Sequence, residues 1–313
     1  MGPFLSVNDL ANIWGISLQG VYKRLEKLGI EQKFRGNKLY FDHNDAHALF
    51  GFEFLPKMYA VQIIKGGVGK TALAIAIAIQ ASLLGAKVLV VDTDKQGNAT
   101  DSLKIDAEDK PVLYDMLYDN IPIEECIVNV YPGLDLLPSR IENGLLDRLI
   151  SLKFKNIQPI LERTFKPIQN NYDFILFDCP SDLGLLVAAI ALYTRNIICP
   201  VIADKHSIKG LKLNYKEYHD LEADYNININ KKIIFNKFDS RVGLSDNLYV
   251  QLLEHPTYKD SILKAFLRVN QDFTNSIAKG ETIFSNLKKS TAKEDICLIT
   301  MELLGLQDLS RNK

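Results

Sequence analysis

Along most of the chain, short apolar runs alternate with longer stretches in which apolar residues recur every three or four positions. From residue 58 onward the runs read, in order, MYAVQII, KVLVVD, DLLP, DFILFD, NIICPV and KIIFNKF. β-like runs that alternate with helical stretches predict an α/β fold with a doubly wound, mostly parallel sheet. Ligands of such sheets bind outside the carboxyl ends of the strands, so we expect functional motifs directly after these runs.

The longest apolar tract, residues 71–91, approaches the length of a membrane span, which needs about 20 apolar residues. Polar residues and a glycine interrupt it at Gln80, Ser82, Gly85 and Lys87. The pattern therefore predicts a helix over 71–84 that leads into a buried strand over 87–91. We expect no membrane segment.

Residues 1–55 differ from the rest, with shorter helical patterns and a run of basic residues. The segment GFEFLP at 51–56 then leads into the first long apolar run. A chain of 313 residues is long enough for two domains. We therefore expect a small domain over 1–55 and a larger one over 56–313.

The N-terminal segment has the spacing of a helix-turn-helix. A short helix ending at Trp14, a glycine turn at Gly15 and a hydroxyl cap at Ser17 lead into a helix over Leu18–Leu28. The alternation over Lys33–Tyr40 predicts a hairpin that would form a wing. The segment resembles the MerR-like winged helix-turn-helix, and the second helix of such a motif lies in the major groove of DNA.

Basic and polar side chains of this segment are candidates for DNA contacts. Residues 17–40 contain six Lys or Arg and two Glu, a net charge of +4, which suits phosphate contacts. The candidate DNA-binding residues are Gln19, Tyr22, Lys23, Arg24, Arg35 and Lys38. The alternative is a small helical docking domain whose basic face is only solvated.

The whole chain is not basic, because 37 Lys and Arg against 38 Asp and Glu give a net charge of −1. A uniformly basic nucleic-acid binder is therefore excluded. A second basic region lies at 259–293, with seven Lys or Arg against three acidic residues. It suits sequence-independent DNA binding, for which Lys288 and Lys289 are candidates. Lysines on solvated helices are an equal alternative.

The four cysteines lie far apart without a Cys-x-x-Cys pair, so we expect neither a zinc site nor an iron–sulfur cluster. The N-terminus lacks the basic start and apolar stretch of an export signal. We expect a cytoplasmic protein with buried, reduced thiols.

A glycine-rich loop follows the first long apolar run. Lys65–Thr71 reads KGGVGKT and leads into a helical stretch. Glycines allow backbone N–H groups to close around phosphate oxygens, and the helix N-terminus adds its positive dipole end. Lys70 is placed to reach the β- and γ-phosphates, and the Thr71 hydroxyl to ligate Mg²⁺. Ile64 breaks the strict Walker pattern, and Lys65 is an additional lysine.

A single acid ends the run Phe174–Asp178, and P-loop enzymes hold a second Mg²⁺ anchor at such a position. Asp178 is therefore a metal-binding candidate. Together, KGGVGKTALA, VLVVDTDKQGNAT and YDFILFDCPSDLGLL resemble the deviant-Walker ATPases of the ParA/Soj partition family and, more loosely, their MinD relatives. The resemblance covers about residues 58–305, through ICPVIADKHSIKGLKL, IIFNKFDSRVGLSDNL, AKGETIF and KSTAKEDICLITMELL.

The resemblance implies roles for individual residues of an ATPase that uses ATP and Mg²⁺. Lys65 matches the signature lysine, which contacts phosphate across an ATP-sandwich homodimer. Asp94 matches the acid that orients the attacking water, and Asp178 the Walker B acid that holds Mg²⁺ through water. Asn236 lies where the fold often contacts adenine. The implied catalytic residues are Lys65, Lys70 and Asp94, and the implied cofactor-binding residues are Lys65, Gly66, Gly67, Val68, Gly69, Lys70, Thr71, Ala72 and Asn236.

Three departures from the family pattern concern the hydrolysis rate. Ala72 replaces a usual Thr, Lys95 replaces a usual Pro, and Ser181-Asp182 stands where Pro-Ser is common. Lys95 adds a positive charge beside Asp94, which can hold that carboxylate out of position. We therefore expect slow hydrolysis even for this family.

The resemblance implies a nucleoid-associated DNA-partition ATPase that is stimulated by a ParB-like centromere-binding partner and also represses its own operator. The alternatives are a nucleotide-sensing transcriptional repressor and a MinD-like membrane-cycling ATPase. A membrane-cycling protein needs a basic amphipathic C-terminal helix. The C-terminal sequence MELLGLQDLSRNK is acidic at its start, which disfavours the membrane-cycling alternative.

Overall fold

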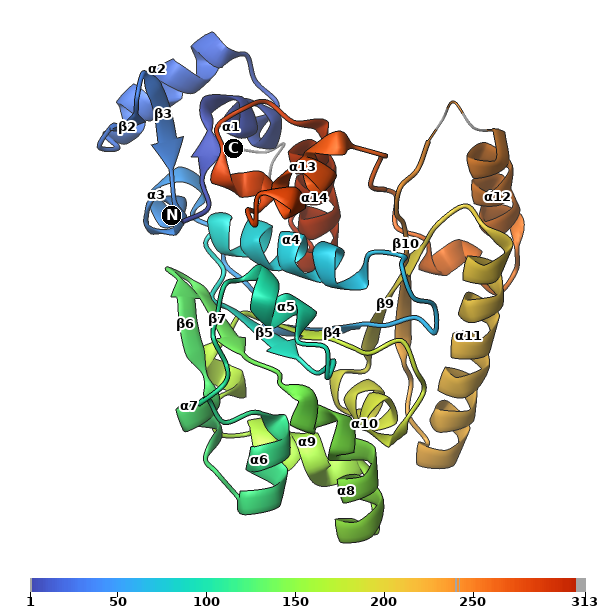
Figure 1. The fold of residues 1–313 in the computed structure, drawn as a ribbon. Coiled ribbons are helices and arrows are strands. Elements are labelled where there is room, and N and C mark those ends of the chain that lie inside the picture. The colour runs from blue at the N-terminus through green and yellow to red at the C-terminus, as the bar shows by residue number, and fades with distance from the viewer. Residues whose placement is uncertain (1, 240, 242, 308–313) are drawn as a thin grey trace.

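The computed structural model of the chain describes residues 2–239, 241 and 243–307. Its centre is a seven-stranded sheet in the order β10-β9-β4-β8-β5-β7-β6 (Figure 1). The strands are β4 (Lys57–Val61), β5 (Val88–Asp92), β6 (Val128–Tyr131), β7 (Leu134–Leu137), β8 (Phe174–Asp178), β9 (Asn196–Val201) and β10 (Asn230–Phe235). Every neighbouring pair is parallel except β6 and β7. The predicted doubly wound, mostly parallel α/β fold is confirmed.

The central strands are apolar on both faces because helices cover both sides of the sheet. In β8, Phe174 and Leu176 pack into one hydrophobic cluster, whereas Ile175 and Phe177 pack into the other. The edge strand β6 was not predicted from the sequence. It is short and antiparallel, and its residue Asn129 is exposed.

Helices form a layer on each face of the sheet, as Figure 1 shows. One layer contains α4 (Lys70–Leu83), α5 (Asn98–Ser102), α13 (Gln271–Ala278) and α14 (Thr291–Leu304), with η4 (Ile283–Ser285). The other contains α6 (Leu113–Asp119), α7 (Ile123–Cys126), α8 (Leu146–Lys153), α9 (Gln158–Phe165), α10 (Leu185–Thr194), α11 (Lys205–Tyr225) and α12 (Gly243–Glu254). The same part of the chain also contains the 3₁₀ turns η1 (Ile141–Leu145), η2 (Gln169–Asn171) and η3 (Lys259–Ser261).

The long apolar tract is divided between a helix and a strand, as predicted: α4 begins at Lys70, and β5 begins at Val88. No helix within the described residues is both long enough and apolar enough to cross a membrane. Residues 308–313, part of the C-terminal sequence that disfavours membrane cycling, lie outside the described residues.

The N-terminal segment contains the predicted helices and hairpin, with one further strand and one further helix. The elements are β1 (Leu5–Ser6), α1 (Val7–Trp14), α2 (Leu18–Leu28), β2 (Lys33–Arg35), β3 (Lys38–Phe41) and α3 (His43–Phe50), and the strands pair antiparallel in the order β1-β3-β2. Gly15 turns the chain with a φ of 64°, and the Ser17 hydroxyl accepts a hydrogen bond from the Gly20 N–H. Both features had been expected from the sequence. In α2, Val21 and Leu25 are buried, whereas Leu28 is exposed.

The N-terminal segment packs directly on the C-terminal helices. Its apolar residues share one hydrophobic cluster with α4 and α14. The Asp9 carboxylate lies 3.8 Å from the Lys293 ammonium of α14, and the Phe4 N–H donates to the Phe284 carbonyl of η4 over 3.1 Å. The N-terminal segment is therefore held against η4 and α14.

Candidate functional site

The glycine-rich loop connects β4 to α4, as its sequence predicts. Gly67 and Gly69 adopt left-handed conformations, with φ of 77° and 85°. A Cβ added at Gly69 would lie 2.7 Å from the amide nitrogen of Asn236. Glycine is therefore required at position 69 for both the backbone conformation and the close approach of a neighbouring strand end.

Lys70 is held with its ammonium inside the loop. Its Nζ donates to the Lys65 carbonyl over 3.1 Å and to the Ile63 carbonyl over 3.4 Å, and it also contacts the Ser181 hydroxyl. Burial lowers the pKa of Lys70, and the charge of Asp178 opposes this shift. A buried cation of this kind favours an anionic ligand, because a phosphate would compensate the lost hydration.

Two carboxylates lie side by side at the carboxyl ends of β5 and β8. Asp92 and Asp178 are register partners in the sheet. Asp92 accepts hydrogen bonds from both the N–H and the hydroxyl of Thr100, and burial raises its pKa to about 6. Burial and the neighbouring Asp92 charge raise the pKa of Asp178 to about 8. Loss of hydration thus makes the charged forms of both carboxylates costly.

Asp178 meets the requirements of a magnesium anchor. It is fully buried, and among the described residues neither carboxylate oxygen has a hydrogen bond of normal length; the nearby Thr71 hydroxyl only opposes the rise of its pKa. Buried polar groups are nearly always paired, so an unpaired carboxylate points to a missing cation. The Thr71 hydroxyl, at the start of α4, supplies a second oxygen near the loop. The described residues contain no cluster of three His, Cys, Asp or Glu suited to a metal, so phosphate and water oxygens would complete the coordination.

Asp94 lies beside the loop, half-buried, at the wall of the adjoining cavity. Its carboxylate accepts a hydrogen bond from the Gln96 N–H over 3.0 Å, and its carbonyl accepts one from the Ser139 hydroxyl over 2.6 Å. The Lys95 side chain lies along Gly144 and forms no ion pair with Asp94. The expected effect of the Lys95 charge on Asp94 stays a prediction.

Lys65 forms an ion pair that the sequence did not indicate. Its ammonium lies 3.6 Å from the carboxylate of Asp204, and both side chains are about one-third exposed or less. Asp204 also caps α11, because its other carboxylate oxygen accepts a hydrogen bond from the Ser207 N–H over 2.7 Å. The pair therefore links the start of the glycine loop to the start of α11.

A buried polar network attaches α11 to the same loop. Asn214 accepts a hydrogen bond from the Ile64 N–H over 2.9 Å, and its amide nitrogen contacts Gln62. The Tyr218 hydroxyl donates to the side-chain Oε1 of Gln62 over 2.7 Å, and the side-chain Nε2 of Gln62 donates to the Asp182 backbone carbonyl over 2.7 Å. These contacts join residues up to 156 positions apart, so no local pattern could have predicted them.

Asn236 supports the loop from the end of β10. Its amide donates to the Val68 carbonyl over 2.6 Å, so its amide nitrogen is engaged by the loop in this conformation. The next residue, Lys237, has a φ of 54° and donates its ammonium to the Gly67 carbonyl over 3.2 Å. Lys237 and Ser181 are loop contacts that sequence reasoning missed. The sequence did offer a signal for each: Lys237 directly follows the end of an apolar run, and Ser181 lies where the sequence departs from the family pattern.

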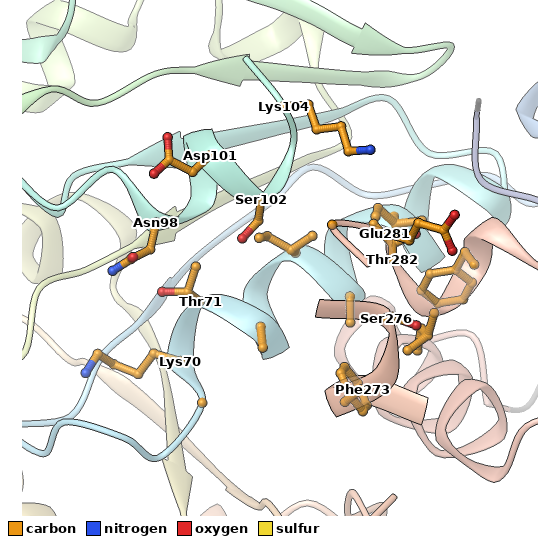
Figure 2. A pocket seen from close by; sticks show the side chains of 18 of the residues that line it. Lys70, Thr71, Asn98, Asp101, Ser102, Lys104, Phe273, Ser276, Glu281 and Thr282 are labelled. Carbon is orange, nitrogen blue, oxygen red and sulfur yellow. The ribbon is translucent and has the colours of Figure 1, made fainter. Parts of the chain in front are cut away.

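A cavity of about 560 Å³ adjoins the loop and runs along α4. Figure 2 shows Lys70 and Thr71 at one end, Asn98 on α5 at the side, and Phe273 and Ser276 on the opposite wall. The wall formed by residues 280–284 is the same segment to which Phe4, just before β1, donates a hydrogen bond at the Phe284 carbonyl. Away from Lys70, polar and apolar side chains both line the cavity, among them Ser276, Glu281, Ile283 and Phe284.

Comparison with known proteins places this site in a family. The family model described as "AAA domain" matches residues 56–233, more than half of the chain. Cell division protein PomZ of Myxococcus xanthus is 30% identical over 235 residues, which cover 74% of this chain and 73% of PomZ. Sporulation initiation inhibitor protein Soj of Bacillus subtilis is 27% identical over 233 residues, covering 72% of this chain and 90% of Soj. The chain belongs to the ParA/Soj family of partition ATPases.

A solved structure shares the fold of this ParA/Soj-type ATPase. The plasmid partition protein of Borrelia burgdorferi, bound to AMPPNP, superimposes with a TM-score of 0.66 at 22% identity. The match covers 81% of this chain and 99% of that protein. At this identity the comparison concerns the fold, and the binding residues of this chain are argued from its own geometry.

The DNA-contact candidates of this ParA/Soj-type ATPase differ in how free they are. Gln19, Tyr22, Lys23, Lys38 and Lys288 are exposed. The Arg24 guanidinium lies 4.3 Å above the Trp14 ring, and the Arg35 guanidinium donates to the Ser285 carbonyl over 3.2 Å. Lys289 lies 3.9 Å from Glu294.

The basic region at 259–293 is partly neutralised within the fold. Arg268 is paired with Asp295, and Lys293 is buried beside Asp9. Fewer of its seven basic side chains are therefore available to a partner than the sequence suggested.

Proposed function

We propose that this ParA/Soj-type ATPase binds ATP and Mg²⁺ at Lys65–Thr71, dimerises on ATP and hydrolyses it slowly. The observation that carries the proposal is the buried, unpaired carboxylate of Asp178 close to the buried ammonium of Lys70. Both charges are costly without a ligand, and a triphosphate with a divalent cation would satisfy both. The AMPPNP bound to the Borrelia protein supports a nucleoside triphosphate as that ligand.

The residues of the chain have distinct tasks in this reaction. Lys70 holds the β- and γ-phosphate oxygens, and the loop N–H groups of Gly66–Ala72 surround them. Thr71 and, through water, Asp178 hold Mg²⁺, which when bound neutralises phosphate charge. Asp94 orients the attacking water toward the γ-phosphate. Asn236 stabilises the loop through its hydrogen bond to the Val68 carbonyl and lies beside the adenine.

Lys65 has its role at the interface between two copies of the chain. Lys70 already occupies the loop's own phosphate position, so a second lysine at the loop's first position is best used by a facing subunit. To reach that phosphate, Lys65 must leave Asp204. Dimerisation and hydrolysis then depend on the same lysine.

Two variants separate assembly from chemistry. Lys65→Ala is expected to bind nucleotide but to lose ATP-dependent dimerisation and turnover. Asp94→Ala is expected to dimerise with ATP and not to hydrolyse it. Light scattering measures dimerisation, and phosphate release measures turnover. A Lys65→Ala protein that dimerises and hydrolyses normally would remove the central mechanism of the proposal.

We further propose that the protein acts in DNA partition, associated with the nucleoid and stimulated by a ParB-like centromere-binding partner. Residues 1–55 would form the operator-binding winged helix-turn-helix domain of an autorepressor, and 56–313 the ATPase domain. The exposed polar face of α2 supports DNA binding, because Gln19, Tyr22 and Lys23 point away from its packed face.

A second candidate function, a nucleotide-sensing repressor, is favoured by the contacts of η4. This segment lines the cavity beside the loop on one side. On its other side it accepts hydrogen bonds from Phe4 and from Arg35 of the wing. Binding of operator and of random duplex DNA, measured with and without ATP or ADP, distinguishes the two candidates. Operator binding that Lys23→Ala leaves unchanged would contradict both the autorepressor and the sensor.

A further inference from the structure

The solvent face of α11 carries a row of lysines. They are spaced by four, three and four residues, which places them on one face of the helix over three turns. The four, all exposed, are Lys205, Lys209, Lys212 and Lys216. The buried residues of α11, such as Leu211 and Tyr218, lie on the opposite face. Residues 205–216 contain no Asp or Glu. We call these four residues the lysine row.

The lysine row weakens the helix that carries it. Like charges three or four residues apart repel one another, and the acid at the start of α11, the N-cap Asp204, is engaged by the Ser207 N–H and by Lys65. Within the described part of the chain, none of the four ammonium groups has an ion-pair partner within 4 Å. A row of like charges without ion-pair partners opposes stability and therefore indicates a binding role.

We propose that the lysine row binds the phosphate backbone of duplex DNA without sequence preference. From Lys205 to Lys216 the helix rises about 16 Å at about 1.5 Å per residue, which is about five base-pair steps of roughly 3.4 Å. Flexible ammonium groups contact phosphates and carry no base readout. A membrane-binding helix would need a free apolar face beside its basic face, and the apolar face of α11 is buried in the protein.

The lysine row is a better DNA-binding surface than the region at 259–293 considered from the sequence. In that region Lys289, Arg268 and Lys293 have acidic partners. On α11 the four acids all follow the row in the sequence, at Glu217, Asp220, Glu222 and Asp224. The positive charge is therefore concentrated at the end of α11 that contacts the nucleotide loop.

The position of the lysine row is fixed by the nucleotide site. Asp204 contacts Lys65, Asn214 contacts the Ile64 N–H, and Gln62 completes the buried network beneath them. This part of the inference rests on the proposed function: an ATP-dependent dimer presents two lysine rows in fixed orientation. Two linked rows bind one duplex far more tightly than one row does. ATP-dependent DNA binding then requires no change within α11.

The test is a charge-removing variant, Lys209→Gln/Lys212→Gln/Lys216→Gln, with a matched control. The control, Lys110→Gln/Lys155→Gln/Lys166→Gln, removes three exposed lysines elsewhere. Fluorescence anisotropy measures binding to a random-sequence duplex with ATP and Mg²⁺ at several salt concentrations. Each phosphate contact adds about 0.9 to the slope of log affinity against log salt, so the row variant is expected to lose about 2.7 per protomer. From 50 to 200 mM salt, the affinity of the unaltered chain would fall about 40-fold more than that of the variant for each row that contacts the duplex.

Three outcomes would overturn the inference: an unchanged salt slope in the row variant, an equal loss in the control, or loss of binding to phosphatidylserine vesicles with DNA binding retained. The urea midpoint of each variant verifies that it is folded. Lys65→Ala tests the contribution of dimerisation. If this variant stays monomeric, its salt slope is expected to be about half that of the unaltered dimer. If Lys65→Ala still dimerises, the proposed function fails while the comparison of row and control variants still decides the lysine row.

Discussion

Replacement of Lys293 by Met tests whether the buried contact between the two ends of the chain stabilises the N-terminal segment. The Lys293 side chain is 2% exposed, and its ammonium lies 3.8 Å from the Asp9 carboxylate. It also donates to the Asn286 carbonyl over 2.5 Å. Removing one partner of a buried pair costs about 3–5 kcal/mol, because the other charge stays buried. Asp9 keeps two hydrogen bonds from Ser6 at 2.7 Å, so we expect the lower value, about 3 kcal/mol.

The double variant Asp9→Asn/Lys293→Met supplies the control. It leaves no buried charge, and an Asn oxygen can still accept the hydrogen bond from the Ser6 N–H. Replacing both members of a buried pair by neutral groups is often close to neutral, so we expect it to lie within about 1 kcal/mol of the unaltered chain. A large loss in both variants would mean that packing, and not charge, holds the contact.

The chain contains its own probe for this measurement. Trp14 is the single tryptophan, and it is buried in α1 between Arg24 and Phe50. In urea, its fluorescence reports on the N-terminal segment, and far-ultraviolet circular dichroism reports on the whole chain. For Lys293→Met we expect the tryptophan transition to move by about 1 M urea, taking a slope of about 3 kcal/mol per M. A Lys293→Met protein with both transitions unmoved would refute the reasoning.

Two further predictions concern the glycine loop and its ion pair. Gly69→Ala should lower the free energy of unfolding of the nucleotide-free protein, measured in urea, by about 2 kcal/mol. The reason is that alanine disfavours the left-handed φ of position 69 and that its Cβ would clash with the Asn236 side chain. Gly66→Ala has open space and should cost under about 0.5 kcal/mol, so equal losses would contradict the argument. Asp204→Asn should change stability by less than about 1 kcal/mol, because the pair with Lys65 is partly exposed. It should also tighten ATP-driven dimerisation up to about fivefold in light scattering, and weaker dimerisation would count against it.

The sequence predicts those parts of the fold that follow from local patterns. The central strands are buried on both faces, so they appear as uninterrupted apolar runs. The glycine loop is recognisable because each of its residues has a local requirement, such as the left-handed φ of Gly69. The helix α3 was not predicted, because its sequence HNDAHALF is polar over much of its length and has a weak apolar period.

Contacts between distant segments are the part of the site that the sequence does not predict. Gln62 and Tyr218 are 156 residues apart, and they meet because α11 directly follows β9, the strand that pairs with β4, and packs back along the sheet. The same holds for Asp204 beside Lys65 and for Asp9 beside Lys293. Each of these residues is unremarkable in its own segment, and its task follows only from the tertiary arrangement.

The buried charges at the loop favour the binding of a cation and of phosphate. Burial raises the pKa of both Asp92 and Asp178 and lowers that of Lys70, so without ligands each group is shifted toward its neutral form. A divalent cation beside Asp178 would restore its charged form, and phosphate oxygens beside Lys70 would restore the ammonium. The cost of burying these charges lowers the stability of the ligand-free protein. Ligand binding removes that cost, so the bound protein is more stable than the free one.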